Sequence, residues 1–286
     1  MQVSPRFNPY IIKITMKTII VSFSLLLVAI FYSCQEKDYE IDIKADVPKI
    51  RKVIIADLPF YEYSYTNADI ISEEKSIFNF TKFSYNDKAR LMTADYYSDN
   101  ALLGNDLQVL ENALDGKGLL NLADSRKGGT LEFKYDIYGQ LIKTIFGGAS
   151  GNNPESSEFS YDSEGRISRQ TLLWENKIAG YVDYLYDEEG NLIKETVSSI
   201  SISGLPELST TTLYEFDNYK NPFKTFYLLM TPGINTNTNN IIKETYIIHF
   251  KPGQGTDIIR ITLNSYSYNS MGYPVRKNGN IEYLYE

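Results

Sequence analysis

Apolar and polar residues alternate along most of the chain after residue 51, and short polar turn signals interrupt the alternation at regular intervals. The plainest example is YLYDEEGNLIKET, Tyr184–Thr196. Its period of two predicts two β-strands, because successive side chains of a strand point to opposite faces of the sheet. Between them, Asp187 suits the first position of a type I turn and Gly190 suits a residue with positive φ. The stretch therefore predicts a tight β-hairpin.

Copies of this hairpin recur along the chain. FKYDIYGQLIK and FSYDSEGRISR place an acid and a glycine at the same turn positions: Asp136 with Gly139 and Asp162 with Gly165. Weaker copies begin at three further positions: Phe83, Tyr214 and Tyr266. Strong copies are about 25 residues apart, the length of two strands and two short turns. The repetition predicts an all-β fold, a repetitive antiparallel meander of long hairpins. Burial of its aromatic face requires a curled or barrel-like sheet.

The simplest register pairs residues at equal distances from the turn: Tyr186 with Leu192, Leu185 with Ile193 and Tyr184 with Lys194. In the other two strong copies the same register pairs Tyr135 with Leu141, Phe133 with Lys143, Tyr161 with Ile167 and Phe159 with Arg169. This register predicts that one face of the sheet carries both aromatic and basic side chains.

Lys143, Arg169 and Lys194 then form a basic ladder on the aromatic face, with Lys224 and Arg276 at the same position of weaker copies. Together with the single tryptophan, Trp174, this ladder is a candidate binding surface for an anionic or carbohydrate polymer. The alternative is that aliphatic stems cover the rings, with a cation–π gain of about 0.5–1 kcal/mol at each site. The second interpretation is favoured because such covering is ordinary.

The Tyr-Asp-x-x-Gly-x-Leu pattern at Tyr135, Tyr161 and Tyr186, with Ile for Leu in the second copy, resembles the YD repeat of the Rhs type. Combined with the N-terminal leader, it makes the chain similar to small Bacteroidota lipoproteins of unknown function, some described as porin-like. The resemblance covers about residues 80–286 and implies an array of β-hairpins. It implies no catalytic residue.

The N-terminal residues resemble an export signal. Met16 and Lys17 open a basic segment, and an apolar run of about 16 residues leads to Cys34. The run is shorter than the roughly 20 residues of a membrane-spanning helix and is typical of a signal peptide. The sequence predicts a signal peptide over residues 1–33, with translation starting at Met16. The alternative is an anchoring helix that buries the cysteine.

Cys34 resembles the lipidated residue of a bacterial lipoprotein, which implies the membrane as a partner through a lipid anchor. Residues 34–50 then form an acidic tether, and residues 51–286 form a single repetitive β domain. Acids next to the cysteine resemble the signal that sends Bacteroidota lipoproteins to the outer surface of the outer membrane. A solvated tether has the same composition, so the surface is favoured and the periplasmic face stays open.

Composition limits the chemistry further. A formal net charge of −8 argues against nucleic acid, whose phosphates require a basic surface. The only histidine, His249, lies in an apolar strand pattern, and no nucleophile elbow, phosphate loop or typical zinc site accompanies it. Acids such as Asp162 and Asp187 are explained as turn formers. The sequence therefore predicts no catalytic residue, no metal, no cofactor and a protein that is not an enzyme.

One helix is expected, over GNDLQVLENALDGKG at residues 104–118. Asn105 and Gln108 suit a capping box, and Gly116 suits the helix end. We expect this short helix to cover an edge of the sheet, and the alternative is that it plugs one end of the sheet.

These features predict a non-enzymatic binding or adhesion module, carried on an outer-membrane lipoprotein at the cell surface. Its ligand is expected to be a glycan or a host or envelope protein. Two alternatives are a structural scaffold of the envelope and a carboxylate-based hydrolase that acts on glycans.

Overall fold

The computed structural model of this 286-residue chain describes residues 48–77, 79–99, 119, 125–148, 155–229, 232–233, 235–251 and 253–286. All of them lie in the second of the chain's two compact units, Ile43–Glu286. The predicted signal peptide, Cys34, nearly all of the tether and the helix expected at residues 104–118 lie outside the described residues. In the described part of the chain, no helix is long and apolar enough to cross a membrane.

Antiparallel strands make up most of the regular structure. They are β1 Ile50–Ile55, β2 Leu58–Tyr65, β3 Ile71–Ser76, β4 Asn79–Tyr85, β5 Leu91–Asp99, β6 Ser125–Tyr135, β7 Leu141–Gly148, β8 Glu155–Tyr161, β9 Ile167–Trp174, β10 Lys177–Tyr186, β11 Leu192–Ile200, β12 Pro206–Phe216, β13 Ile241–Ile248, β14 Ile258–Leu263, β15 Tyr266–Tyr268, β16 Pro274–Lys277 and β17 Ile281–Tyr285. Among the described residues the only helix is the 3-10 helix η3, Pro222–Leu229.

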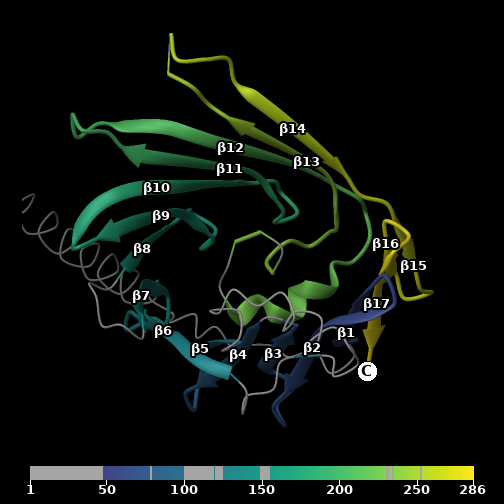
Figure 1. Ribbon diagram of the computed structural model, residues 1–286. Helices are drawn as coiled ribbons and strands as arrows, with labels where there is room; N and C mark the ends of the chain where they lie inside the picture. The colour runs from purple at the N-terminus through teal and green to yellow at the C-terminus, as the bar shows by residue number, and fades with distance from the viewer. Residues whose placement is uncertain are drawn as a thin grey trace, which may run out of the picture. The chain divides into compact units, whose positions relative to one another are not determined.

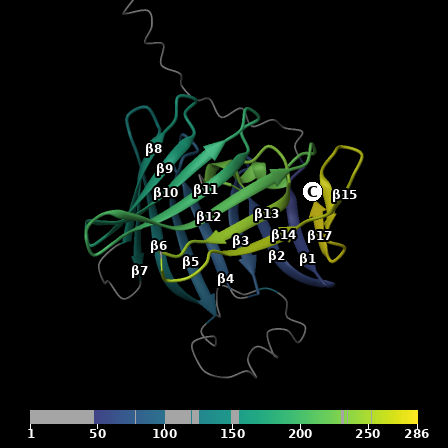
Figure 2. The same ribbon diagram turned by 90° about the horizontal axis from the view of Figure 1, so that it is seen from above.

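The strands form one curled meander sheet. Each strand from β1 to β13 pairs with the next, β15 pairs with β16 and β16 with β17, and β17 pairs back with β1. No register pair joins β14 to β15, and the sheet is not closed into a barrel. Figure 1 shows the sheet curling around η3, and Figure 2 shows the same curl from above. The predicted all-β antiparallel meander is confirmed.

The face that η3 contacts is called the concave face here, and the opposite face the convex face. Phe226 of η3 packs in a buried cluster with Ile50, Val53 and Tyr63, and Leu229 at its end packs against a second cluster around Phe133. The helix therefore supplies the second layer that the aromatic face of the sheet requires.

The hairpin turns have the geometry that their residues predict. The Oδ1 atom of Asp187 accepts hydrogen bonds from the amides of Glu189 and Asn191, at 3.0 and 2.8 Å. The following glycine, Gly190, has a φ of +87°. Asp136 with Gly139 and Asp162 with Gly165 repeat the arrangement. A side-chain cap and one left-handed residue thus close each strong copy.

The register next to these turns differs from the simplest one. Tyr186 pairs with Leu192 as predicted, but Leu185 pairs with Lys194 and Tyr184 with Glu195. One extra residue, a β-bulge, lies directly after each strong turn, so Phe133 pairs with Thr144 and Phe159 with Gln170. A slip of one residue moves every following side chain to the other face. The expectation that basic residues share the aromatic face was wrong: Lys143, Arg169 and Lys194 lie on the convex face.

Tyrosine hydroxyls tie five of the repeats to the repeat before them. In these five, the second aromatic residue donates its hydroxyl proton to the backbone carbonyl of the first residue of an earlier strand. The donors and acceptors are Tyr65 to Ile50, Tyr85 to Ile71, Tyr135 to Leu91, Tyr161 to Leu141 and Tyr186 to Ile167, at 2.6 to 2.8 Å. The hydroxyl explains why this position is tyrosine in five repeats. Phe216 occupies it in β12 and has no hydroxyl to donate.

The copy that begins at Tyr214 is not a continuous hairpin, which corrects the sequence interpretation. β12 ends at Phe216, and the partner residue of Phe216 is Ile241 at the start of β13. Residues 218–239 lie between the two ends of the turn and include η3. Lys224 and its neighbours therefore belong to an insertion rather than to a strand.

Candidate functional site

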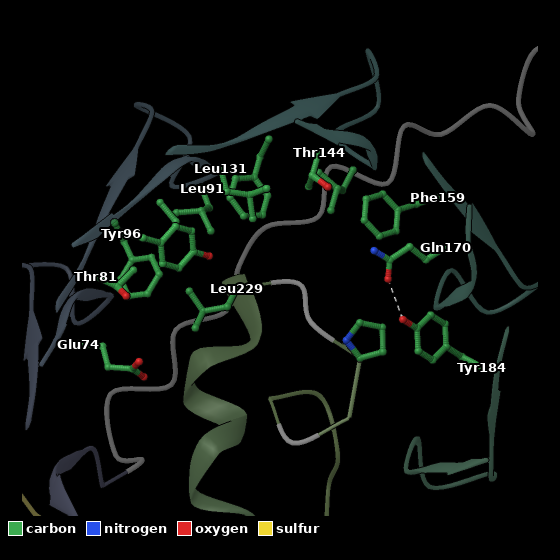
Figure 3. Close-up of a pocket in the computed structure, with 15 residues that line it drawn as sticks. Glu74, Thr81, Leu91, Tyr96, Leu131, Thr144, Phe159, Gln170, Tyr184 and Leu229 are labelled. Atoms are coloured by element: carbon green, nitrogen blue, oxygen red, sulfur yellow. Dashed lines mark hydrogen bonds between the residues drawn. The ribbon is translucent and has the colours of Figure 1, made fainter. Parts of the chain in front are cut away.

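A cavity of about 290 Å³ lies on the concave face between the sheet and the segment that follows η3. Figure 3 shows side chains from several strands converging on it, with Leu229 at the end of η3 facing them. Its apolar surface comes from residues such as Leu91, Phe133, Leu141 and Leu229. A cavity lined by apolar and aromatic groups with a few polar ones is the usual form of a small-molecule site.

The repeat itself builds the aromatic wall of this cavity. Phe133, Phe159 and Tyr184 are the first aromatic residues of three successive hairpins, on β6, β8 and β10. Because the turns and bulges are equivalent, each hairpin presents the same position to the concave face. Successive rings consequently line the cavity from neighbouring hairpins.

A hydrogen-bonded polar group lies at one end of the cavity. The hydroxyl of Tyr184 donates to Gln170 Oε1 at 2.9 Å, and Gln170 Nε2 donates to Ser157 Oγ at 2.8 Å. Burial, and then nearby acids led by Glu195, raise the pKa of Tyr184 well above its ordinary value of 10.0. The phenol therefore stays protonated, and the chain of bonds fixes the orientation of the amide.

An unpaired carboxylate lies at the other end. Glu74 of β3 lines the cavity with Thr81 and Tyr96, and Figure 3 shows these three side chains together. No described residue gives Glu74 a hydrogen bond or an ion pair within 4 Å. Burial raises the pKa of Glu74 above its ordinary value of 4.5, because desolvation disfavours the charged form. Burial and then the charge of Glu74 also raise the pKa of Tyr96.

The concave face carries further acidic side chains. Glu195 lies opposite Tyr184, and Glu244 lies opposite Tyr214. Burial and then Glu244 raise the pKa of Glu195. Lys277 is a basic group that interacts with Glu244: burial lowers the pKa of Lys277, and Glu244 partly raises it. The electrostatics around Glu195 and Glu244 therefore favour a cation over an anion.

A second hollow of about 280 Å³ adjoins the first, and Pro232 lines both. Arg166 and Lys224 lie on its wall with Tyr186. Arg166 Nε is 2.7 Å from Asp162 Oδ2, and its guanidinium lies 4.9 Å from the centre of the Tyr186 ring. Lys224 Nζ donates to Thr238 Oγ1 at 2.8 Å, and burial lowers its pKa. Lys224 lies in η3 and not opposite Tyr214 on a strand, contrary to the sequence interpretation.

The structure places none of the predicted ladder residues at the cavity. Lys143 Nζ is 3.1 Å from Glu158 and Arg169 Nε is 2.5 Å from Asp183, both across neighbouring strands on the convex face. Lys194 is exposed on the same face. Trp174 is 52% exposed at the end of β9. Arg276 pairs with Ser267 rather than with Tyr266. Exposed ion pairs of this kind each contribute about 0–1 kcal/mol.

The turn acids serve the turns. Partial burial raises the pKa of Asp162, but hydrogen bonds from Arg166 and from the backbone outweigh this effect and hold the pKa below its ordinary value. A general acid requires a raised pKa. Asp136, Asp162 and Asp187 accept backbone hydrogen bonds, and the glycines Gly139, Gly165 and Gly190 supply the positive φ.

His249 lies in an arrangement that the sequence did not indicate. Its Nδ1 atom is 2.7 Å from Asp257 Oδ2, and its Nε2 atom is 2.9 Å from Thr211 Oγ1. The order of groups is that of a hydroxyl, imidazole and carboxylate relay. The Thr211 side chain is buried within β12, and Asp257 also accepts from the amide of Phe250 at 3.1 Å. These contacts tie the β13–β14 loop to β12. Only the fold brings Thr211, 38 positions away, to His249.

No group of three or more metal-ligating side chains is present among the described residues. Within this part of the chain, the unexplained polar group at a cavity is Glu74, which the sequence did not single out. Its signal in the sequence is weak, because Glu74 lies in the polar run SEEK, in which every residue is expected to be exposed to solvent.

Comparison with known proteins gives weak structural likenesses. No model of a known protein family matches the chain, and no curated protein matches it by sequence. A porin-like protein from Bacteroides uniformis is 11% identical with a TM-score of 0.36, over 83% of this chain and 98% of the other. A porin-like protein from Bacteroides vulgatus is 12% identical with a TM-score of 0.38, over 84% of this chain and 99% of the other.

A third likeness is to a complex of TcdB2, TccC3 and Cdc42, at 16% identity and a TM-score of 0.31. It covers 77% of this chain and 11% of the larger one. With TM-scores this low, these three likenesses do not support a conclusion about function.

Proposed function

We propose that this chain is a non-enzymatic binding protein of the bacterial envelope, and that it holds a small organic cation with an apolar body in the concave cavity. One observation carries the proposal: the unpaired, partly buried carboxylate of Glu74 at the end of an aromatic and apolar cavity. A buried charge without a partner is unfavourable, so a ligand that supplies the opposite charge is strongly favoured.

The lining fits such a ligand in two ways. Rings on the cavity wall, including Phe83 and Phe159, bury an apolar body and attract a cation through their faces. Gln170 and Tyr184 offer hydrogen-bonding groups at the far end. The acids Glu195 and Glu244 add to the negative potential of the same face. An anchored location through a lipid on Cys34, facing the cell surface, is part of the proposal and rests on the leader sequence.

Isothermal titration calorimetry of the full chain in phospholipid nanodiscs tests this proposal. The probe is 4-phenylbutylamine, and 4-phenylbutanoate is the matched anion of the same shape. Saturable binding of the amine and none of the carboxylate is expected, with empty nanodiscs correcting for partition into lipid. Equal binding of both probes, or binding of neither, would overturn the proposal.

The variant Glu74→Gln keeps the shape of the side chain and removes its charge. We expect amine binding to weaken at least about tenfold, the loss of one favourable charged contact of roughly 1.4 kcal/mol. Glu73→Gln is the matched control, because Glu73 lies on the same strand, points to the convex face and pairs with Lys75. If both variants weakened binding equally, the amine would not be bound through Glu74 in the cavity.

The pH dependence has a definite sign. Because the pKa of Glu74 is raised above 4.5 in the folded chain, the folded state binds this proton more tightly than the unfolded state. Its contribution to stability is full below the unfolded pKa and is lost as the pH rises through the folded pKa. Glu74→Gln should therefore stabilise the free protein at pH 7, measured by thermal unfolding, with little change near pH 4. Amine affinity should fall as acidification protonates Glu74.

A glycan or protein ligand has one observation in its favour, the indole of Trp174, 52% exposed at the end of β9. Exposed indoles commonly form such contacts. A glycan array probed with the full chain and with Trp174→Ala tests this second candidate. Binding that the tryptophan variant loses would support it. Release of sugar from the array would instead support the hydrolase alternative.

A further inference from the structure

Among the described strands, β14 and β15 each have a single partner, and β14 is the longer of the two. β14 pairs with β13 on one side, and no described strand pairs with its other side. Figure 1 shows β14 at the margin of the curl, next to β13 only. Exposed edges of this kind are places where a further strand adds to a sheet.

The backbone groups that face this open edge can be identified from the register. The amide of Asn264 donates to the carbonyl of Ile242 at 2.8 Å, so Asn264 belongs to a hydrogen-bonded pair with β13. In an antiparallel ladder, such pairs alternate with pairs whose backbone groups point away from each other. Ile259, Ile261 and Leu263 therefore direct their amides and carbonyls to the open edge.

The side chains of the same three residues lie on the convex face. Ile261 pairs with Thr245, which pairs with Leu213, and Leu213 pairs with the convex residue Lys194. Ile259, Ile261 and Leu263 are 60%, 60% and 69% exposed. The only charged residue of the strand, Arg260, points to the concave face. The charged or proline residues that usually protect an edge strand are therefore missing from its convex side.

We propose that β14 pairs with β14 of a second copy of this chain, antiparallel about a two-fold axis, with Ile261 opposite Ile261. Ile259 of each copy then faces Leu263 of the other. This arrangement forms about six backbone hydrogen bonds and brings the three apolar side chains of both copies together on one face. It joins two sheets into one across the axis.

The strand is self-complementary in this register, which favours a second copy over an unrelated strand. A two-fold axis through Ile261 uses all three residues with free backbone groups and places Arg260 opposite Thr262. An axis through Arg260 instead sets two like charges against each other and leaves Leu263 without a partner in the strand. A two-fold contact also pairs the open β14 edge of each copy with that of the other, so assembly stops at a dimer.

Cysteine crosslinking of the full chain in detergent micelles tests the register. Ile261→Cys places two thiols opposite each other, and mild oxidation should give a covalent dimer whose link maps to position 261. Leu185→Cys is the matched control, because Leu185 is 55% exposed on the convex face of a strand with both edges paired. The unchanged chain, whose single cysteine is Cys34, measures any crosslinking through that residue. Equal crosslinking of the three proteins would overturn the proposal.

Sedimentation of the full chain gives a second readout. The unchanged chain should sediment as a dimer, and Ile261→Lys, which sets two like charges opposite each other, should weaken association at least about tenfold. Ile142→Lys, on the convex face of β7 and 44% exposed, should leave the dimer intact. A monomeric unchanged chain, or a dimer that Ile261→Lys leaves intact, would overturn the proposal.

Discussion

Two hairpins of the sheet, β10–β11 and β12–β13, use the same turn chemistry to join very different connections. Asp187 and Asn191 close the first, with the Asp187 amide donating to the Asn191 carbonyl at 3.0 Å. Asp217 and Asn240 close the second, with the equivalent bond also at 3.0 Å. Residues 188–190 complete the first connection, whereas residues 218–239 lie between the two ends of the second.

The difference shows that turn closure and connection length are separable in this fold. The acid directly after one strand accepts a hydrogen bond from the amide of the residue directly before the next strand: Asp187 Oδ1 from Asn191 at 2.8 Å and Asp217 Oδ1 from Asn240 at 3.1 Å. Since the bonds are made by the two ends, a long insertion between them leaves the strand register in place. The cost of the longer loop rises only slowly with its length.

The insertion then does what the short turn does not. It contributes η3, whose Phe226 is buried under the sheet, and it brings Leu229 and Pro232 to the cavity. Its end docks on the neighbouring short turn, where Asn191 Oδ1 accepts from the amides of Thr238 and Asn239, both at 2.9 Å. A regular repeat builds the sheet, and one interrupted repeat builds the cavity.

The strongest test of this comparison is Phe226→Ala. Phe226 is 2% exposed, and its ring centre lies 4.8 Å from that of Tyr63. Removal of a buried aromatic side chain is expected to lower the free energy of unfolding by about 3–5 kcal/mol. Urea unfolding measures the loss. Tyr227→Ala, at the exposed neighbouring position, should lose far less, and a similar loss for both would show that η3 adds little to the core.

Asn191→Ala breaks the contact between the two connections. Asn191 is fully buried, and its removal leaves the amides of Thr238 and Asn239 without their acceptor. Unsatisfied buried groups lower the free energy of unfolding by about 1–3 kcal/mol. Gln140→Ala changes the equivalent position of the β6–β7 hairpin, where no insertion docks. A loss as large in that control would place the effect in the turn itself.

The same comparison separates what the sequence predicts from what it does not. Pairing of Tyr186 with Leu192 follows from the turn residues between them, and the structure confirms it. The bulge beyond that pair adds one unpaired residue, Ile193, and nothing in its identity marks it. One such residue reverses the face of Lys194 and turns the expected ladder into a row on the convex face.

The cavity could not be read from the chain for a related reason. Asp217 looks like the start of another tight turn, and only the fold shows that Asn240 is its partner. Glu74, Gln170 and Leu229 are far apart in sequence and meet only when the sheet curls. The hydrogen bonds of the tyrosine hydroxyls have a signal in the sequence. The repeats have tyrosine at positions 85, 135, 161 and 186 and phenylalanine at position 216.

Tyr186→Phe sharpens the comparison by making the short hairpin resemble the interrupted one, which has Phe216 at this position. The change removes the hydroxyl that donates to the Ile167 carbonyl at 2.8 Å and keeps the ring. We expect the free energy of unfolding to fall by about 0.5–1.5 kcal/mol. Tyr138→Phe, at a turn position that is 69% exposed, is the control and should change little.

The smallest expected effect concerns a third hairpin, β4–β5, which keeps the short connection but not its glycine. Asn86 Oδ1 accepts from the amides of Lys88 and Arg90, both at 3.0 Å, so the cap is present. Ala89 has a φ of +57°, where a residue with a Cβ atom is strained by about 1 kcal/mol.

Ala89→Gly should therefore raise the free energy of unfolding by up to about 1 kcal/mol. The gain is reduced because glycine has more conformational entropy than alanine in the unfolded chain. The reverse change at the matched position, Gly190→Ala, should lower it by a similar amount. Urea unfolding of both variants gives the two values. Opposite signs would show that the left-handed residue contributes to the stability of both short connections, at Ala89 and at Gly190.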